Sequence, residues 1–105
     1  MPYLIDATDR PGSQALRQTL RPRHLAFVDD NAHRLLAAGA KLSEDGGPVG
    51  TFYILSAENR SEVEAFAAAD PYTAGELFAD VIITRWRKGY FNFVRAEAPP
   101  LEAGK

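Results

Sequence analysis

The chain is predicted to fold as an α+β domain of the ferredoxin-like type, with an antiparallel sheet and the element order β-α-β-β-α-β. Three features predict this class. A strand-like segment opens the chain at 3–8, two more flank a glycine-rich turn in the middle, and a fourth runs over 77–86. Helical apolar patterns separate the first strand from the second and the third from the fourth. One domain is expected over residues 1–95, followed by a flexible tail at 96–105.

The composition is that of an ordinary globular protein and argues against several functional classes. Hydrophobic residues make up 46% of the 105 residues, which is enough for a core without disulfides. Twelve Lys and Arg residues against 14 Asp and Glu residues give a formal net charge of -2, which argues against a general nucleic-acid binder. The chain has no cysteine, so thiolate chemistry is absent and a cytoplasmic location is expected. It shows neither a secretory signal nor an apolar run of about 20 residues, so no membrane association is expected.

The first strand is expected at 3–8, because aromatic and β-branched residues there precede the turn sequence Asp9-Arg10-Pro11-Gly12. Its apolar residues occupy both alternating sets of positions, which favours a central place in the sheet. Ser13 is then expected to cap a short helix that runs towards Leu20.

A second helix is predicted from Pro22 to about residue 38. Proline lacks a backbone donor and clashes with the preceding helical turn, so Pro22 suits the first position of a new helix. A core-facing apolar stripe supports this helix, and Gly39 is expected to end it as a left-handed C-cap. These boundaries place His24 in the first turn of the helix. The stripe consists of Leu25, Val28, Ala32, Leu35 and Leu36.

A β-hairpin is predicted in the middle of the chain. Its strands are expected at 40–44 and 49–55, with the glycine-rich sequence Asp45-Gly46-Gly47-Pro48 as the turn. Gly50 lies inside the second strand, where a glycine indicates a bulge or the close approach of another group.

The last helix is expected to begin near the capping-box sequence Ser61-Glu62-Val63-Glu64, with Asn59 as a competing cap. It should end before Asp70, because the residue ahead of a proline disfavours helical geometry. Residues 71–76 are expected to form an ordered loop or a single helical turn before the last strand. The segment at 90–94 is apolar enough that it is expected to dock against another surface, which the sequence does not identify.

An antiparallel sheet with helices on one face leaves its other face uncovered. A second copy of the chain would cover the apolar side chains there, so a homodimer is expected. The Val81-Ile82-Ile83 run supports this expectation, since it needs burial on both faces or a partner. Candidates for the uncovered face are Phe52, Tyr53, Ile82, Thr84 and Trp86.

Three segments, in their order along residues 3–87, resemble the YciI-like proteins. They are Arg21-Pro22-Arg23-His24-Leu25, Gly50-Thr51-Phe52-Tyr53-Ile54 and Asp70-Pro71-Tyr72. The resemblance implies a dimeric α+β barrel, related in fold to muconolactone isomerases, and it implies that His24 and Asp70 form an active-site pair. Most members have no established substrate, so the resemblance indicates a site more than a reaction.

A histidine and an aspartate side by side can perform general acid/base chemistry. In the first turn of a helix, His24 would be kept neutral by the positive end of the helix dipole. Asp70 would hold one imidazole tautomer and stabilise the cation that forms when the ring takes up a proton. Such a pair suits an isomerase or elimination step on a small cyclic or aromatic metabolite, and proton transfer of this kind contributes ~10²–10⁴ in rate.

Tyr72 is expected to line the same pocket, and Arg21 and Ser43 are expected to bind the substrate there, with Arg21 suited to a carboxylate or a phenolate. Each residue also has a structural interpretation. His24 can be a half-buried histidine with a hydrogen bond, and Asp70 a turn former. Tyr72 can be a packed aromatic, and Arg21 part of a solvated helix flank. The sequence leaves these alternatives open.

No nucleotide, metal or cofactor site is expected. The chain contains neither a GxGxxG motif nor a phosphate-binding P-loop motif. His24 and His33 are nine residues apart, about 180° around a helix, so they do not suit a shared metal. The expected function is a small enzyme that works without a cofactor. A non-catalytic ligand-binding or accessory module is the alternative, and a structural dimerisation domain is a third possibility.

Overall fold

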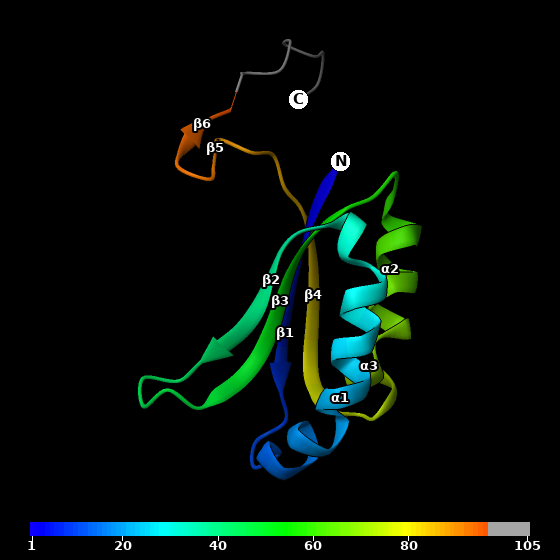
Figure 1. The fold of residues 1–105 in the computed structure, drawn as a ribbon, viewed down its shortest axis with the longest axis vertical. Helices are drawn as coiled ribbons and strands as arrows, with labels where there is room; N and C mark the ends of the chain where they lie inside the picture. Colours follow the sequence, from blue (N-terminus) through cyan, green and yellow to red (C-terminus); the bar gives the residue numbers. More distant parts are fainter. Residues whose placement is uncertain (97–105) are drawn as a thin grey trace.

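The computed structural model describes residues 1–96, which form a four-stranded antiparallel sheet with the helices packed on one face (Figure 1). The strand order is β2-β3-β1-β4, so the first strand lies inside the sheet, as predicted. This order confirms the ferredoxin-like α+β class. The strands are β1 (Pro2–Asp9), β2 (Leu35–Leu42), β3 (Pro48–Ser56) and β4 (Phe78–Arg85). The helices are α1 (Gln14–Asp30), the 3-10 helix η1 (Ala32–Arg34), α2 (Arg60–Ala69) and α3 (Pro71–Ala74).

The hydrophobic core lies between the helices and the sheet. Along β1 and β3, side chains that are buried under the helices alternate with less buried ones. Phe66 of α2 joins the two long helices to the sheet, because its ring centroid lies 4.9 Å from that of Phe27 in α1 and 5.2 Å from that of Tyr53 in β3. The buried residues of this cluster are Tyr3, Ile5, Tyr53, Leu55, Ala57, Val63 and Phe66.

One continuous helix, α1, runs through Pro22, so the prediction of a new helix starting there is wrong. A proline inside a helix leaves the carbonyl four residues earlier without its amide donor. Here that residue is Gln18, which is exposed, so water can bond to its carbonyl. Arg17, Leu20 and His24 are the buried residues of α1, and their packing holds the helix across the proline.

The helix also ends earlier than predicted, at Asp30 rather than near residue 38. Asn31 follows it, and both its backbone N–H and its side-chain Nδ2 donate to the carbonyl of Phe27, the latter at 2.8 Å. The predicted end of the helix is instead strand β2, paired with β3, and Gly39 is a strand residue rather than a C-cap. Pairing with β3 therefore outweighs the helical apolar pattern of this segment.

The hairpin turn forms where it was predicted, and the N–H of Ser43 donates to the carbonyl of Gly47 across it at 2.9 Å. The predicted close approach at Gly50 is confirmed. A Cβ atom there would lie 2.3 Å from the carbonyl oxygen of Ala7 and 2.4 Å from Cε of Lys41. Position 50 therefore has no room for a side chain.

Asn59, the competing cap, is the residue that caps α2. Its side chain accepts from the N–H of Glu62 at 3.1 Å, and the Glu62 carboxylate accepts in return from the N–H of Glu58 at 2.8 Å. The helix ends one residue before Asp70, and Pro71 begins the single turn of α3, both as predicted. This break places Asp70 between two helices.

The sheet face opposite the helices carries accessible apolar side chains. Phe52 pairs with Asp6, which pairs in turn with Ile82, so all three lie on this face, and Ile82 is 53% exposed. Lys41 crosses the same face to Asp6, with Nζ 2.6 Å from Oδ1. Tyr53, which was named among the candidates for this face, lies on the opposite one, because its side chain is buried under the helices.

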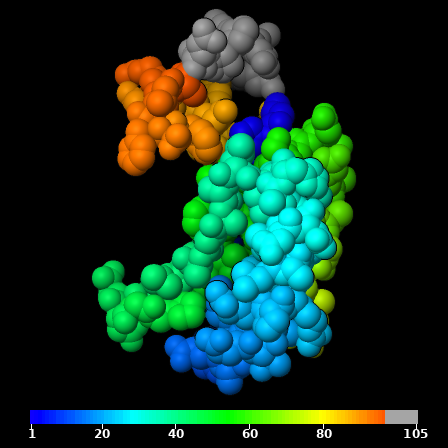
Figure 2. All heavy atoms as spheres, viewed as in Figure 1, coloured from blue at the N-terminus to red at the C-terminus, as the bar shows by residue number. Residues whose placement is uncertain are grey.

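Strands β5 (Tyr90–Phe91) and β6 (Val94–Arg95) form a small hairpin that stands off from the rest of the domain (Figure 1, Figure 2). Phe93 at its tip is 100% exposed. Within the single chain, the expected docking surface for residues 90–94 is therefore not the body of the domain. Of the predicted tail at 96–105, all but Ala96 lies outside the described residues.

Candidate functional site

His24 lies in the middle of α1, so the prediction that it occupies the first turn of a helix is wrong. The dipole of a helix acts mainly within its first and last turns, and the argument from the helix amino terminus therefore does not apply to His24. The histidine is 8% exposed and lies on the buried side of α1, seven residues after Arg17. Its ring is held by side chains from other elements.

Asp70 is the centre of the hydrogen bonds around the histidine. The residue is 1% exposed, and its Oδ1 lies 3.0 Å from Nδ1 of His24. The same oxygen caps α3 by accepting from the N–H of Tyr72 at 2.9 Å. The hydroxyl of Tyr53 donates to Oδ2. The fold thus brings His24 and Asp70 together, and each carboxylate oxygen accepts at least one hydrogen bond.

This geometry determines which nitrogen of His24 is available to a ligand. A carboxylate accepts hydrogen bonds, so Nδ1 carries the proton that it donates to Asp70 and the neutral ring keeps its lone pair on Nε2. Within residues 1–96, every fully buried side-chain nitrogen or oxygen has a hydrogen-bond partner. Nε2 of His24 has none, so it is not fully buried. Nε2 is therefore accessible, and His24 is one of the residues that line the cleft.

Tyr72 packs flat against the histidine. The two ring centroids are 3.9 Å apart with 11° between their planes, and the guanidinium carbon of Arg17 lies 4.8 Å from the centroid of the Tyr72 ring. Arg17 and His24 are two turns apart on α1, so the Tyr72 ring lies between them. Burial raises the pKa of Tyr72, and burial together with the Asp70 carboxylate raises that of Tyr53. Both phenols therefore stay protonated near neutral pH.

Arg17 is a buried residue of this site that sequence reasoning missed. Its Nη1 lies 2.8 Å from one carboxylate oxygen of Asp9 and 3.0 Å from the other, and its Nη2 donates to the hydroxyl of Thr51 at 2.8 Å. Tyr53 was missed as well, because it was considered only as a candidate for the opposite sheet face. For Arg17 the available signal was its spacing, since a residue seven positions before His24 lies on the same side of a helix.

The cleft in front of His24 has a volume of about 430 Å³. It lies where the β2–β3 hairpin diverges from α1, and Figure 2 shows the tip of that hairpin projecting from the body of the molecule. Arg21 and Tyr72 line the cleft, and Ser43 does not. The Ser43 hydroxyl bonds instead to Asp45 and to the Gly47 carbonyl within the hairpin turn, which is the physical reason for that difference.

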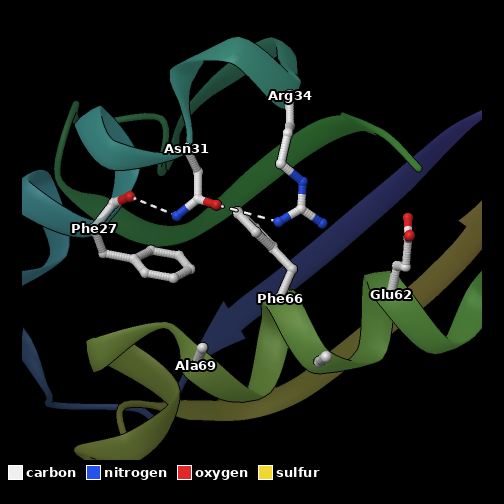
Figure 3. Close-up of a pocket in the computed structure, with 7 residues that line it drawn as sticks. Phe27, Asn31, Arg34, Glu62, Phe66 and Ala69 are labelled. Carbon is white, nitrogen blue, oxygen red and sulfur yellow. Dashed lines mark hydrogen bonds between the residues drawn. The ribbon is translucent and has the colours of Figure 1, made fainter. Parts of the chain in front are cut away.

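A second hollow of similar size, about 410 Å³, lies between α2 and the end of α1 (Figure 3). Figure 3 shows Arg34 reaching back to Asn31, to which its Nη1 donates at 3.2 Å, and the guanidinium lies 5.6 Å from the centroid of the Phe66 ring. No residue predicted for the site lines this hollow. The hollow in front of His24 is therefore the better candidate.

Two further properties bear on the chemistry of residues 1–96. Within this range, no three His, Cys, Asp or Glu side chains gather closely enough to hold a metal ion. None of the helices described is long and apolar enough to cross a membrane. The polar side chains that line the cleft are one imidazole, two phenols, two guanidinium groups, the amide of Gln18 and the hydroxyl of Thr51.

The YCII-related domain matches residues 1–87 of the chain. The chain belongs to this family. Protein YciI of Escherichia coli is 32% identical to it over 96 residues, which cover 84% of this chain and 98% of that protein. An uncharacterized protein of Haemophilus influenzae is 33% identical over the same shares of the two chains. The resemblance to YciI-like proteins is therefore confirmed.

One solved structure related to this YCII-family chain carries a ligand. It is the 5-chloro-2-hydroxyhydroquinone dehydrochlorinase TftG from Burkholderia phenoliruptrix, in complex with 2,5-dihydroxybenzoquinone. The two chains are 35% identical and superpose with a TM-score of 0.80, over 85% of this chain and 96% of TftG. The YCII-related fold is thus found in an enzyme named for a reaction on a small aromatic compound.

Proposed function

We propose that this protein is a small enzyme that works without a cofactor and transfers protons on a small aromatic metabolite, with His24 as the general acid and base. The observation that carries the proposal is the orientation of the imidazole. Asp70 bonds Nδ1, while Nε2 remains accessible on a ring that lines the cleft. The relationship to TftG supports an aromatic substrate and an elimination or isomerisation step.

In such a reaction, Nε2 of His24 takes a proton from an acidic hydroxyl or carbon of the bound ring. The imidazolium that forms is stabilised by the Asp70 carboxylate, which Tyr53 and the N–H of Tyr72 keep in place. For an isomerisation, the same nitrogen returns the proton to another ring position. For an elimination, the proton returns to the carbon that carries the leaving group. The leaving group then departs with its bonding electrons as a second hydroxyl gives its proton to Nε2 of His24, which is neutral again after it has returned the first proton.

We further propose that the active form is a homodimer. The support is the uncovered sheet face, which carries Phe52, Ile82 and the Lys41–Asp6 ion pair. An apolar surface of this kind is stabilised by burial against a second copy, and two-fold symmetry suits a self-complementary face. A cytoplasmic location belongs to the same proposal, since a cysteine-free chain suits a reducing compartment.

Turnover of a chlorinated ring tests the proposed chemistry. The wild type is incubated with 5-chloro-2-hydroxyhydroquinone, the compound for which TftG is named, and chloride release is measured. His24→Asn keeps a donor for Asp70 but has no base, so the rate should fall by ~10²-fold or more. The matched control is His33→Asn, because His33 is the other histidine of the chain and is exposed.

The outcomes separate an enzyme from a binding module. Loss of turnover in His24→Asn but not in His33→Asn supports the proposal. Equal rates in the wild type and in a folded His24→Asn variant would remove His24 from the chemistry. Tight binding of 2,5-dihydroxybenzoquinone with no turnover of any related ring would favour the alternative, a non-catalytic ligand-binding module.

A further inference from the structure

We infer that the cleft in front of His24 selects ligands that carry a negative charge, and that Arg21 supplies the charge that selects them. This inference rests on the proposed function, since it assumes that the cleft is the ligand site. It adds the electrostatic class of the substrate, namely an aromatic ring with an ionised oxygen such as a phenolate, an enolate or a carboxylate.

The lining of the cleft is the first observation. Its residues include two arginines and a histidine, and none of them is an aspartate or a glutamate. The chain as a whole is slightly acidic, with a formal net charge of -2, so a cationic cleft is not a consequence of the overall composition. Charges of one sign along a cleft raise the local concentration of ligands of the opposite sign.

The two arginines are not equivalent, and their partners show which of them is available. Arg17 is held by the Asp9 carboxylate, with 8% of each side chain exposed, so its charge is already balanced inside the protein. Arg21 is exposed and forms no ion pair with any carboxylate of residues 1–96. The unbalanced positive charge of the cleft is therefore the guanidinium of Arg21, which offers several donors to one anion.

The position of Arg21 relative to His24 suits a ligand of one ring. The two residues are three apart on α1, and side chains at this spacing lie on one face of a helix with about 5–6 Å between their Cβ atoms. A six-membered ring with oxygens on opposite sides spans a similar distance. One oxygen can then accept from Arg21 while another meets Nε2 of His24. The rest of the ring meets apolar lining from Leu25, Val28 and Leu42.

The ordinary alternative is that Arg21 is a solvated side chain on the flank of the helix. Arg23 provides the matched control for this alternative. It lies two residues further along α1, is equally charged and exposed, and does not line the cleft. A general effect of positive charge on the helix would act through both arginines, whereas recognition of a ligand in the cleft requires only Arg21.

Binding of a charged and a neutral quinone tests the inference. The charged probe is 2,5-dihydroxybenzoquinone, whose vinylogous acid groups are ionised at pH 7, and the neutral probe is its dimethyl ether. Titration calorimetry gives the Kd of each for the wild type, Arg21→Gln and Arg23→Gln. We expect the wild type to prefer the anion and Arg21→Gln to lose about tenfold in affinity for it, with little change for the ether. Arg23→Gln should match the wild type.

The remaining outcomes separate a failure of the charge selection from a failure of the proposed function. Equal binding of the two probes by the wild type, or equal effects of the two arginine variants, would overturn the charge selection and leave the proposed acid/base chemistry standing. If the wild type binds neither probe, the cleft is not an aromatic site, and the inference falls together with that part of the proposed function.

Discussion

Replacing Asp70 by alanine tests whether this carboxylate organises the site. In the native fold it accepts hydrogen bonds from three buried donors, which are Nδ1 of His24, the N–H of Tyr72 and the hydroxyl of Tyr53. Leaving a buried donor without its acceptor costs about 1–3 kcal/mol. Removal of the buried carboxylate itself recovers part of that cost, because the charge no longer has to be desolvated. The net loss in the free energy of unfolding should be about 3–5 kcal/mol.

Urea unfolding followed by far-UV circular dichroism measures this loss. A domain of this size has a stability of about 5–15 kcal/mol, so Asp70→Ala should remain folded only with a small margin. Asp70→Asn should lose less, about 1–2 kcal/mol, because its amide oxygen can still accept from His24 and Tyr72. Asp80→Ala is the control, since Asp80 is exposed and forms no ion pair within residues 1–96. If the free energy of unfolding of Asp70→Ala lies within about 1 kcal/mol of the wild-type value, the carboxylate does not hold the site together.

Three further predictions concern the surroundings of the site and the sheet. Tyr53→Phe should lose about 1–2 kcal/mol at pH 7. Because the folded state raises the pKa of Tyr53, its hydroxyl contributes fully to stability below about pH 10, where the phenol of the unfolded chain begins to ionise. Above that pH the contribution decreases. The difference in the free energy of unfolding between variant and wild type, measured in urea, should therefore be smaller at pH 11 than at pH 8. Gly50→Ala should lower the free energy of unfolding, measured in urea, by about 1–3 kcal/mol, because its Cβ would clash with the Ala7 carbonyl. Gly39→Ala should lower it less, because the nearest atom to its Cβ would lie at 3.7 Å. Ile82→Glu should convert the proposed dimer to a monomer in sedimentation experiments, and an unchanged sedimentation coefficient would contradict the open-face interface.

Local chemical signals predicted much of the fold. Asp45-Gly46-Gly47-Pro48 identified the hairpin turn, and the proline after Asp70 identified the end of α2, because turns and proline constraints act over only a few residues. The steric requirement at Gly50 was also visible from its position inside a strand. These features depend little on the rest of the chain, so the sequence was sufficient to locate them.

The errors fall where distant contacts decide the structure. Residues 35–38 continue an apolar pattern that suits a helix, yet the pairing of this segment with β3, such as Leu35 with Leu55, makes it part of strand β2. Pro22 indicated a helix start, but the packing of Leu20 and His24 carries α1 through it. In each case a tertiary contact outweighs a local preference.

The candidate site was predicted in part. The pairing of His24 with Asp70 followed from the resemblance to YciI-like proteins, because no local pattern connects two residues 46 positions apart. Tyr53 and Arg17 complete the site but were not predicted. The face of a strand on which Tyr53 lies depends on register. The burial of Arg17 depends on residues distant in sequence, since Asp9 and Thr51 bind its guanidinium and Tyr72 packs against it.

The tautomer of His24 is the most direct test of the central claim, that Asp70 holds Nδ1 and leaves Nε2 to act on a ligand. Long-range ¹H–¹⁵N correlation spectra of the labelled protein distinguish the two ring nitrogens, and His33, which is exposed, serves as the internal reference. We expect the neutral form of His24 to carry its proton on Nδ1, with an Nε2 resonance that shifts when 2,5-dihydroxybenzoquinone is added and a His33 resonance that does not. A neutral His24 protonated on Nε2, or an Nε2 resonance that is unchanged at a saturating concentration of the quinone, would contradict this claim.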